Sequence, residues 1–202
     1  MIIFRALGAL LSYPSDDLRR ALPEITEIIG RSTLVGAPHR EELLALVDDL
    51  ASGELLDKEE NYVELFDCGR STSLNLFEHL HGESRERGAA MVELKRLYEG
   101  AGLELGGGEL PDYLPVVLEY LSCRELSEAR ELLADCAHII EAIAKALLAR
   151  GSAYAAVMQA LLIVAGKKPI AAASAVASRE RVDDPDEDWP EPPAFENVPM
   201  AP

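Results

Sequence analysis

The sequence predicts an all-α protein with a single domain. Apolar residues recur at helical spacing along most of the chain, and Ser, Asp, Pro and Gly stand where helices begin and end. No stretch alternates apolar and polar residues as a strand or hairpin would. With 202 residues and 49% apolar content, the chain can fill a sizeable core. We expect about eight to ten helices within residues 1–166, and a weak helix followed by a disordered acidic tail in residues 167–202.

The first three helices follow from apolar spacing and from start signals. Residues 2–12 form an amphipathic helix that a Tyr-Pro pair ends. Ser15 is placed to cap the second helix, in which Pro23 should produce a kink or a split. Pro38 suits the first turn of the third helix. The expected order is therefore three helices joined by short connections.

An aromatic helix follows. Asp57 and Glu60 have the N-cap and N3 spacing of a capping-box variant. Tyr62, Leu65 and Phe66 then stand at i, i+3 and i+4, so they share one helical face. A second short helix repeats this arrangement from Phe77. Two aromatic helices are thus expected on either side of one polar loop.

That loop, residues 69–73, and the following segment 82–88 are rich in small residues and arginine. The backbone amides of the loop, with Arg70, could bind an anion at a helix start. The loop lacks the Gly-Lys-Ser/Thr ending of a P-loop, and pairing of Arg70 with Glu78 or Glu83 is the simpler interpretation. Arg85 and Arg87 are likewise expected to form salt bridges on an acidic surface.

The second half continues as helices. Residues 106–108 are three glycines and form a hinge, after which Asp112 can cap the next helix. Ser127 opens a helical region whose apolar period continues to Gly151. Ser152 then starts a last helix of the domain.

The chain is strongly acidic, with a formal net charge of −17. The acidity is not confined to the tail, because the residues before Arg179 carry 17 basic and 28 acidic side chains. Such a body does not suit nucleic acid, which needs clustered Lys and Arg. It favours a cationic partner, although the charge could also serve only to keep the protein in solution.

Cysteine spacing and hydropathy indicate the compartment. Cys68, Cys123 and Cys136 have no zinc or redox spacing, and we expect reduced, mostly buried thiols. The N-terminal residues make a poor signal peptide, and the weakly polar run 153–166 is too short to span a bilayer. A soluble cytoplasmic protein without membrane insertion is expected.

The sequence contains only weak signals for a metal-dependent enzyme or for a serine hydrolase. His79, His81 and Glu83 are close in sequence, but the two histidines would point about 200° apart on a helix. No serine lies in a Gly-x-Ser-x-Gly elbow. We therefore expect no catalytic residue, no metal site and no stably bound cofactor.

Peptide binding fits the residue types best. Aromatic side chains with carboxylates near them in sequence could form an apolar groove with an acidic rim, which would hold a basic amphipathic helix. The alternative is that the aromatic residues form a closed core. The residues concerned are Tyr62, Phe66 and Phe77 with Glu64, Glu78, Glu83 and Asp112.

The segments LFDCGRSTSLNLFEHLHGESRERGAAMVEL and ELPDYLPVVLEYLS resemble the NarJ-type chaperones of respiratory nitrate reductase. The similar region runs from about residue 1 to about residue 166, and residues 70–88 are its most diagnostic part. The resemblance implies an all-helical chaperone without catalysis. Such chaperones bind the N-terminal peptide of a molybdoenzyme subunit and keep it competent for insertion of the molybdenum cofactor.

The resemblance also implies site residues. The aromatic-x-x-Leu-Phe pattern is present at Tyr62, and the Glu-x-Pro-Asp-His hinge motif corresponds to Glu109, Pro111, Asp112 and Tyr113. Tyr113 replaces the usual His, although its phenol could still donate one hydrogen bond. We expect the hinge to bring the second half back onto the aromatic helices. The predicted peptide-binding residues are Tyr62, Phe66, Phe77, Glu78, His81, Glu83, Asp112, Tyr113, Glu119 and Tyr120.

The predicted function is a chaperone that binds the N-terminal peptide of the nitrate reductase catalytic (alpha) subunit. It would act on a molybdenum cofactor enzyme and hold no cofactor itself. A helical adaptor of another pathway is one alternative, but no repeat of 30 to 45 residues is visible. A metal-dependent hydrolase is the other. The sequence leaves the oligomeric state open.

Overall fold

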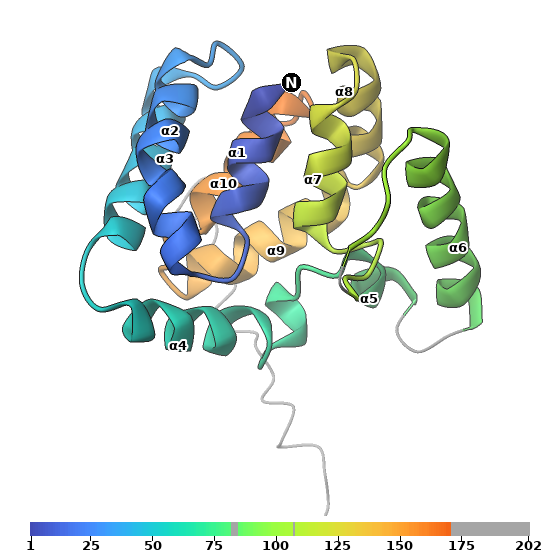
Figure 1. The fold of residues 1–202 in the computed structure, drawn as a ribbon, viewed down its shortest axis with the longest axis horizontal. Coiled ribbons are helices and arrows are strands. Elements are labelled where there is room, and N and C mark those ends of the chain that lie inside the picture. The colour runs from blue at the N-terminus through green and yellow to red at the C-terminus, as the bar shows by residue number, and fades with distance from the viewer. Residues whose placement is uncertain (82–84, 107, 171–202) are drawn as a thin grey trace, which may run out of the picture.

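The computed structural model describes residues 1–81, 85–106 and 108–170. Within these residues the chain forms ten α-helices and one 3-10 helix and no strand, which confirms the predicted all-α class (Figure 1). The expected weak helix at 171–177 and the acidic tail beyond it lie outside the described residues. The domain boundary near residue 166 therefore stays a prediction.

The elements of the first half, in chain order, are α1 (Ile2–Leu10), α2 (Asp16–Arg31), α3 (Ala37–Ala51), α4 (Leu55–Phe66), the 3-10 helix η1 (Arg70–Thr72) and α5 (Leu76–His81). The second half contains α6 (Arg85–Gly100), α7 (Leu114–Ser122), α8 (Leu126–Asp135), α9 (Ala137–Ala149) and α10 (Ala155–Val164). Most connections are short, so consecutive helices pack as neighbours.

One apolar core connects both halves of the chain. Figure 1 shows α1 beside α7, with α2 and α3 on one side and α9 and α10 behind. Gly8 makes the close approach of α1 and α7 possible, because a Cβ there would lie 3.2 Å from the backbone oxygen of Pro115. Helix α10 is apolar on all sides and is buried along nearly its whole length. The functional surfaces therefore lie around this core.

Several helix starts were predicted correctly. The Ser15 hydroxyl accepts a hydrogen bond from the Leu18 backbone amide at 3.1 Å, and Pro38 lies in the first turn of α3. The possible split at Pro23 was wrong, because α2 continues through it. Leu22 and Ile25 bury their side chains on either side of Pro23, and this packing keeps the two parts in one helix.

Other boundaries differ from the prediction. Helix α4 begins at Leu55, so Asp57 lies in its first turn instead of capping it, where its charge still favours the positive end of the helix dipole. Helix α8 begins at Leu126 with Glu125 as its N-cap, one residue earlier than Ser127 suggested. The long apolar period divides into α8 and α9 at Cys136, because the helical period does not register a one-residue break.

The expected burial of the cysteines was mostly wrong. Cys68 and Cys123 are exposed and only Cys136 is partly buried, since the first two follow the ends of α4 and α7. Burial raises the pKa of the Cys136 thiol. In the part of the chain that the structure describes, no helix is long and apolar enough to cross a membrane.

Candidate functional site

The segment before α5 is joined to the segment before α7 by backbone hydrogen bonds. The Leu114 amide donates to the Leu74 oxygen at 2.8 Å, and the Leu76 amide donates to the Asp112 oxygen at 3.1 Å. Asn75 and Tyr113 form the isolated bridge between these bonds. We call residues 74–77 and 112–114 together the latch. The prediction that the hinge returns the chain to the aromatic helices is confirmed for Asp112 and Tyr113.

Asp112 holds the start of α5 in the latch. Its carboxylate oxygen Oδ2 accepts a hydrogen bond from the Phe77 amide at 2.9 Å, and the residue is fully buried. The predictions that Asp112 caps α7 and lies on a groove rim were therefore wrong. Tyr113 is the N-cap residue of α7, and no side chain caps that helix. Asp112 thus accepts from a backbone amide of α5, a helix distant in sequence, and not from one of α7.

Burial raises the pKa of the Asp112 carboxyl, because the charged form loses its hydration. The Phe77 amide and the positive charge of Arg87 act in the opposite direction. Oxygen Oδ1 has no hydrogen-bond partner among the described residues. The Phe77 amide and Arg87 therefore offset only part of the cost of burying the Asp112 carboxylate.

The Tyr113 phenol can donate one hydrogen bond, and it lies close enough to Tyr62 to do so. The Tyr62 hydroxyl donates to the Leu11 oxygen at 2.8 Å, so its oxygen is free to accept from the Tyr113 hydroxyl, which lies 2.8 Å away. The pKa of Tyr62 is raised, first by burial and then by its neighbour Tyr113. This chain of hydroxyls connects α4, the end of α1 and the latch.

The aromatic residues of α4 belong to the core. Tyr62 and Phe66 are only 4% and 5% exposed. Phe66 packs edge-on against Tyr154 with ring centroids 5.1 Å apart, and Tyr62 meets Tyr13 at 5.5 Å. Most of the surface of Tyr62 and Phe66 is therefore buried in a closed core, as the alternative interpretation predicted. Phe77 is half-buried.

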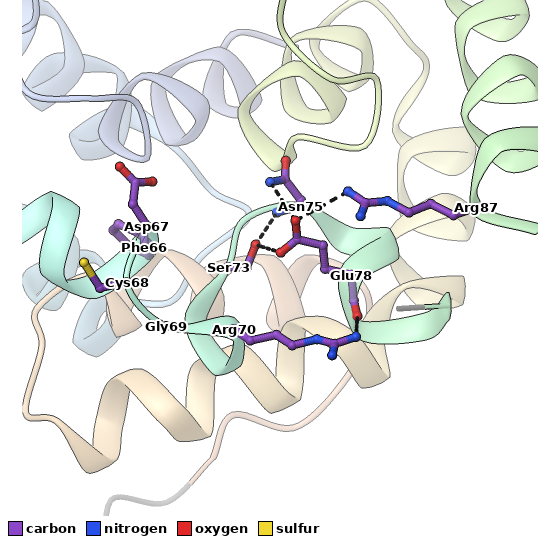
Figure 2. Close-up of a pocket in the computed structure, with 9 residues that line it drawn as sticks. All are labelled: Phe66, Asp67, Cys68, Gly69, Arg70, Ser73, Asn75, Glu78 and Arg87. Carbon is purple, nitrogen blue, oxygen red and sulfur yellow. Dashed lines mark hydrogen bonds and ion pairs between the residues drawn. The ribbon is translucent and has the colours of Figure 1, made fainter. Parts of the chain in front are cut away.

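A cavity of about 440 Å³ lies beside the latch, between the end of α4, η1, α5 and the start of α6. Figure 2 shows the side chains around it, and we call it the polar pocket. Charged and polar groups dominate its lining. The lining residues are Phe66, Asp67, Cys68, Gly69, Arg70, Ser73, Asn75, Glu78 and Arg87.

Glu78 is the centre of the polar pocket (Figure 2). Its carboxylate accepts from the Ser73 hydroxyl at 2.6 Å, from the Asn75 amide at 3.5 Å and from the Arg87 guanidinium at 3.4 Å. Arg70 donates at 3.0 Å to the backbone oxygen of Glu78, not to its carboxylate. The predicted pairing of Arg70 with Glu78 is thus present, although Arg70 contacts the backbone oxygen and not the side-chain carboxylate.

Three predicted residues cannot be placed at this pocket. The side chains of His81, Glu83 and Arg85 lie outside the described residues. The neighbouring His79 contacts the Ser73 backbone oxygen through Nε2 at 2.9 Å. Among the described residues, no group of three or more His, Cys, Asp or Glu is arranged to hold a metal ion.

Glu119 lies in a different place. Two cavities of about 80 and 200 Å³ adjoin along the outer face of α7 and share Glu109, Val116 and Glu119. We call their combined lining the α7 groove. Its other members that matter below are Arg5, Leu103, Glu104 and Leu105. The expectation that Glu119 lies with Tyr62 and Phe77 was wrong, because its position on α7 directs it to the side of α1 and of segment 103–106.

The carboxylates of the α7 groove are unpaired. Glu104, Glu109 and Glu119 are exposed, and none forms a hydrogen bond or ion pair through its side chain with another described residue. Arg5 is the basic side chain among the described residues of the lining. Half-buried Leu103 and Val116 lie between the acids. Exposed acids and partly buried apolar side chains thus line one surface beside α7, away from the aromatic helices.

Tyr120 supports this groove from below. It is 2% exposed, its hydroxyl donates to Glu128 at 3.1 Å, and the Arg124 guanidinium lies 4.9 Å from the centre of its ring. Burial raises the pKa of Tyr120. Of the groove acids, only Glu119 was among the predicted peptide-binding residues. Glu109 was identified only as part of the hinge motif, and Glu104 was missed. The glycine hinge and a predicted helix start separate Glu104 from Glu119, so the two acids are not related by a helical period.

Comparison of the chain with known proteins finds one matching family model and several relatives. The family model described as nitrate reductase delta subunit matches residues 33–159. The nitrate reductase molybdenum cofactor assembly chaperone NarJ of Escherichia coli is 44% identical over 165 residues, which are 82% of this chain and 70% of that protein. A probable chaperone of the same description, NarW of Escherichia coli, is 42% identical over 166 residues, 82% of this chain and 69% of the relative. A probable NarJ of Bacillus subtilis is 35% identical over 164 residues, 80% and 86% of the two chains.

Proposed function

The chain belongs to the nitrate reductase delta subunit family, as the resemblance predicted, and from this membership we propose that it is an assembly chaperone for a nitrate reductase. The three relatives described above are named as molybdenum cofactor assembly chaperones, in agreement with the prediction that this chain is not an enzyme. The client is the catalytic subunit, which receives the molybdenum cofactor. The chaperone itself holds no cofactor stably.

The finer part of the proposal is that the chaperone binds the N-terminal peptide of the catalytic subunit in the α7 groove. The observation that carries this assignment is a set of three exposed carboxylates, Glu104, Glu109 and Glu119, which have no ion-pair partner among the described residues and line the groove together with the apolar side chains of Leu103 and Val116. A bound amphipathic peptide would bury its apolar side chains against Leu103 and Val116. Its basic side chains would meet the three acids.

The polar pocket is the weaker candidate for this peptide. Glu78 already accepts three side-chain hydrogen bonds there, and Arg70 and Arg87 are both bound to Glu78. A peptide would have to break these contacts before it could form its own, and each broken contact would reduce the net gain. We therefore assign Phe77, Glu78 and the arginines to the positioning of α5 in this proposal.

Calorimetric titration of the N-terminal peptide into the full chain tests the assignment. We expect binding that weakens as salt is added, because exposed carboxylates attract a basic peptide through a screened field. Glu119→Gln should weaken binding and reduce its salt dependence. Glu64→Gln is a matched control, since Glu64 is an exposed acid of α4 outside the groove.

Two results would contradict the proposal at different levels. Unchanged affinity in folded Glu109→Gln and Glu119→Gln variants would move the peptide site away from the α7 groove. Absence of peptide binding to the unmodified chain would remove the peptide from the proposed function altogether. Cytoplasmic localisation stays a prediction throughout.

A further inference from the structure

One wall of the α7 groove comes from α1, which runs antiparallel to α7. The Met1 ammonium donates to the Ser122 backbone oxygen at the end of α7, and Gly8 lies against Pro115 near its start. Figure 1 shows the two helices side by side, with the connection between α6 and α7 on the other side of α7. Arg5 lies between these two contacts, on the wall that α1 contributes to the groove.

Arg5 is exposed and has no partner within the described part of the chain. Glu109 and Glu119 line the same cavity of about 200 Å³, but the Arg5 side chain forms no ion pair or hydrogen bond with any described residue. A guanidinium carries five donors and remains charged throughout the physiological pH range. The α1 wall therefore offers one unused cation to a molecule that lies in the groove.

The wall on the other side of α7 has the opposite charge. Segment 103–106 contributes Glu104, and the cavity of about 80 Å³ that this segment lines has glutamates and no basic side chain in its described lining. The neighbours of Arg5 from α1 are small and uncharged, namely Gly8, Ala9 and Ser12. Val116 and Glu119 of α7 line both cavities and lie between the two walls. The α7 groove is thus cationic at one wall and anionic at the other.

Unlike walls distinguish the two directions in which a helix can lie between them. An amphipathic helix that turns its apolar face to α7 has two polar flanks, one toward α1 and one toward segment 103–106. Turning this helix end for end keeps the apolar face in place and exchanges the flanks. For a helix with an acid on one flank and basic residues on the other, one direction pairs opposite charges at both walls. The reverse direction brings like charges together, which opposes association.

We propose that Arg5 is a specificity-determining residue of the α7 groove, which sets the direction of the bound peptide by pairing with an Asp or Glu on one flank of its helix. The inference rests on the proposed binding of the N-terminal peptide in this groove. The preferred ligand is then basic on the flank that meets Glu104 and acidic on the flank that meets Arg5. A helix that is basic on both flanks is disfavoured, because a Lys or Arg beside Arg5 repels it.

A double-mutant cycle tests this role. Calorimetry measures how tightly the full chain and its Arg5→Gln variant bind the N-terminal peptide of the catalytic subunit, and peptides in which one Asp or Glu at a time is replaced by its amide. Salt near physiological strength screens the long-range attraction between the acidic chain and the peptide. Arg5→Gln should weaken binding about threefold, as expected for the loss of one exposed ion pair. One amide peptide should bind both proteins equally, because it already lacks the acid that pairs with Arg5.

Nitroxide labels at the two ends of the peptide report its direction. In the unmodified chain, the two labels should broaden different backbone amide resonances around the α7 groove. In Arg5→Glu both walls are acidic, so the peptide should lie in both directions and each label should broaden both sets of resonances. A single direction that persists in folded Arg5→Glu overturns the inference.

Arg130→Gln is the matched control for the calorimetry, because Arg130 is an exposed arginine of α8 that lines none of the cavities described above. All three variants should keep the thermal midpoint of the unmodified chain, since they change exposed side chains. Unchanged or tighter peptide binding in Arg5→Gln overturns the inference, and so does an equal loss with every amide peptide. In each of these results the peptide still binds, so the proposed function stands. A peptide that does not bind the unmodified chain removes both this inference and the peptide part of the proposed function.

Discussion

The polar pocket and the α7 groove both adjoin the segment that carries the hinge motif, but they treat charge in opposite ways. In the polar pocket, Glu78 accepts hydrogen bonds from Ser73, Asn75 and Arg87. In the α7 groove, Glu109 and Glu119 face solvent without such contacts. Polar groups that satisfy one another hold a fold in place, whereas unsatisfied exposed charges are available to a partner. In the function proposed above, the first region serves stability and the second serves recognition.

The largest expected effect is on the aromatic cluster next to the polar pocket. Phe66→Ala should lower the free energy of unfolding by about 3 to 5 kcal/mol, because it leaves a cavity among packed rings. Urea unfolding followed by circular dichroism measures this change. Val92→Ala, which removes a half-exposed side chain from α6, should change stability by less than about 0.5 kcal/mol. Equal losses in the two variants would mean that the cluster is not a packed core.

The next effect concerns the latch. Asp112→Ala removes the acceptor for the Phe77 amide and should cost about 1 kcal/mol of stability, in the range of other helix caps. Asp112→Asn keeps an oxygen that can accept this bond and should lose less. The order of the two thermal midpoints tests the assignment. A less stable Asn variant would show that the charge of Asp112 matters more than its acceptor geometry.

The pH dependence of stability follows from the same residue. Burial raises the pKa of Asp112 in the folded protein above its ordinary value of 3.8. In the window between these two pKa values the folded state binds more protons than the unfolded state, so this residue makes stability fall as pH rises. The contribution is greatest below the ordinary value and is lost above the folded value. Asp112→Asn should flatten this part of the profile from urea unfolding at several pH values. An identical profile in both proteins would contradict the assignment.

A smaller effect is expected where the latch meets α4. Tyr113→Phe removes the hydroxyl that donates to Tyr62, while Tyr62 keeps its bond to Leu11. The loss should be about 1 kcal/mol, the usual net value of one hydrogen bond. Tyr13→Phe is the control, since the Tyr13 side chain is half-exposed and its hydroxyl forms no hydrogen bond with Tyr62 or Tyr113. Thermal unfolding of the two variants compares them directly, and a neutral Tyr113→Phe would remove the hydroxyl chain from the account of stability.

The smallest effect on stability, and the largest on binding, should come from the α7 groove. Combined Glu104→Gln and Glu109→Gln substitutions should change the free energy of unfolding by less than about 0.5 kcal/mol, because both acids are exposed and have no ion-pair partner in the described part of the chain. Peptide affinity measured by calorimetry should fall and depend less on salt. A stability loss comparable to that of Asp112→Ala would erase the distinction between the two regions.

Local sequence signals were enough to predict the all-α class, most of the helices and the family. Helical periodicity and caps such as Ser15 are local properties, so they can be recognised without knowledge of the packing. The motifs around Tyr62 and Asp112 identified the segments that meet. Local signals also explain the failures near Asp57 and Cys136, where the start or the break of a helix depends on what its neighbours bury.

Which of these residues are buried and which are exposed depends on packing between distant segments, and this became visible only in the three-dimensional structure. Tyr62, Phe66 and Asp112 have the residue types of a binding groove, but all three are buried: the two aromatic rings pack against Tyr154, and Asp112 binds the start of α5. Glu119 has an ordinary sequence context, and its exposure on α7 beside Glu109 makes it available. Residue type fixes the interactions that a side chain can make, whereas burial and pairing, which depend on distant segments, decide which of them remain free for another molecule.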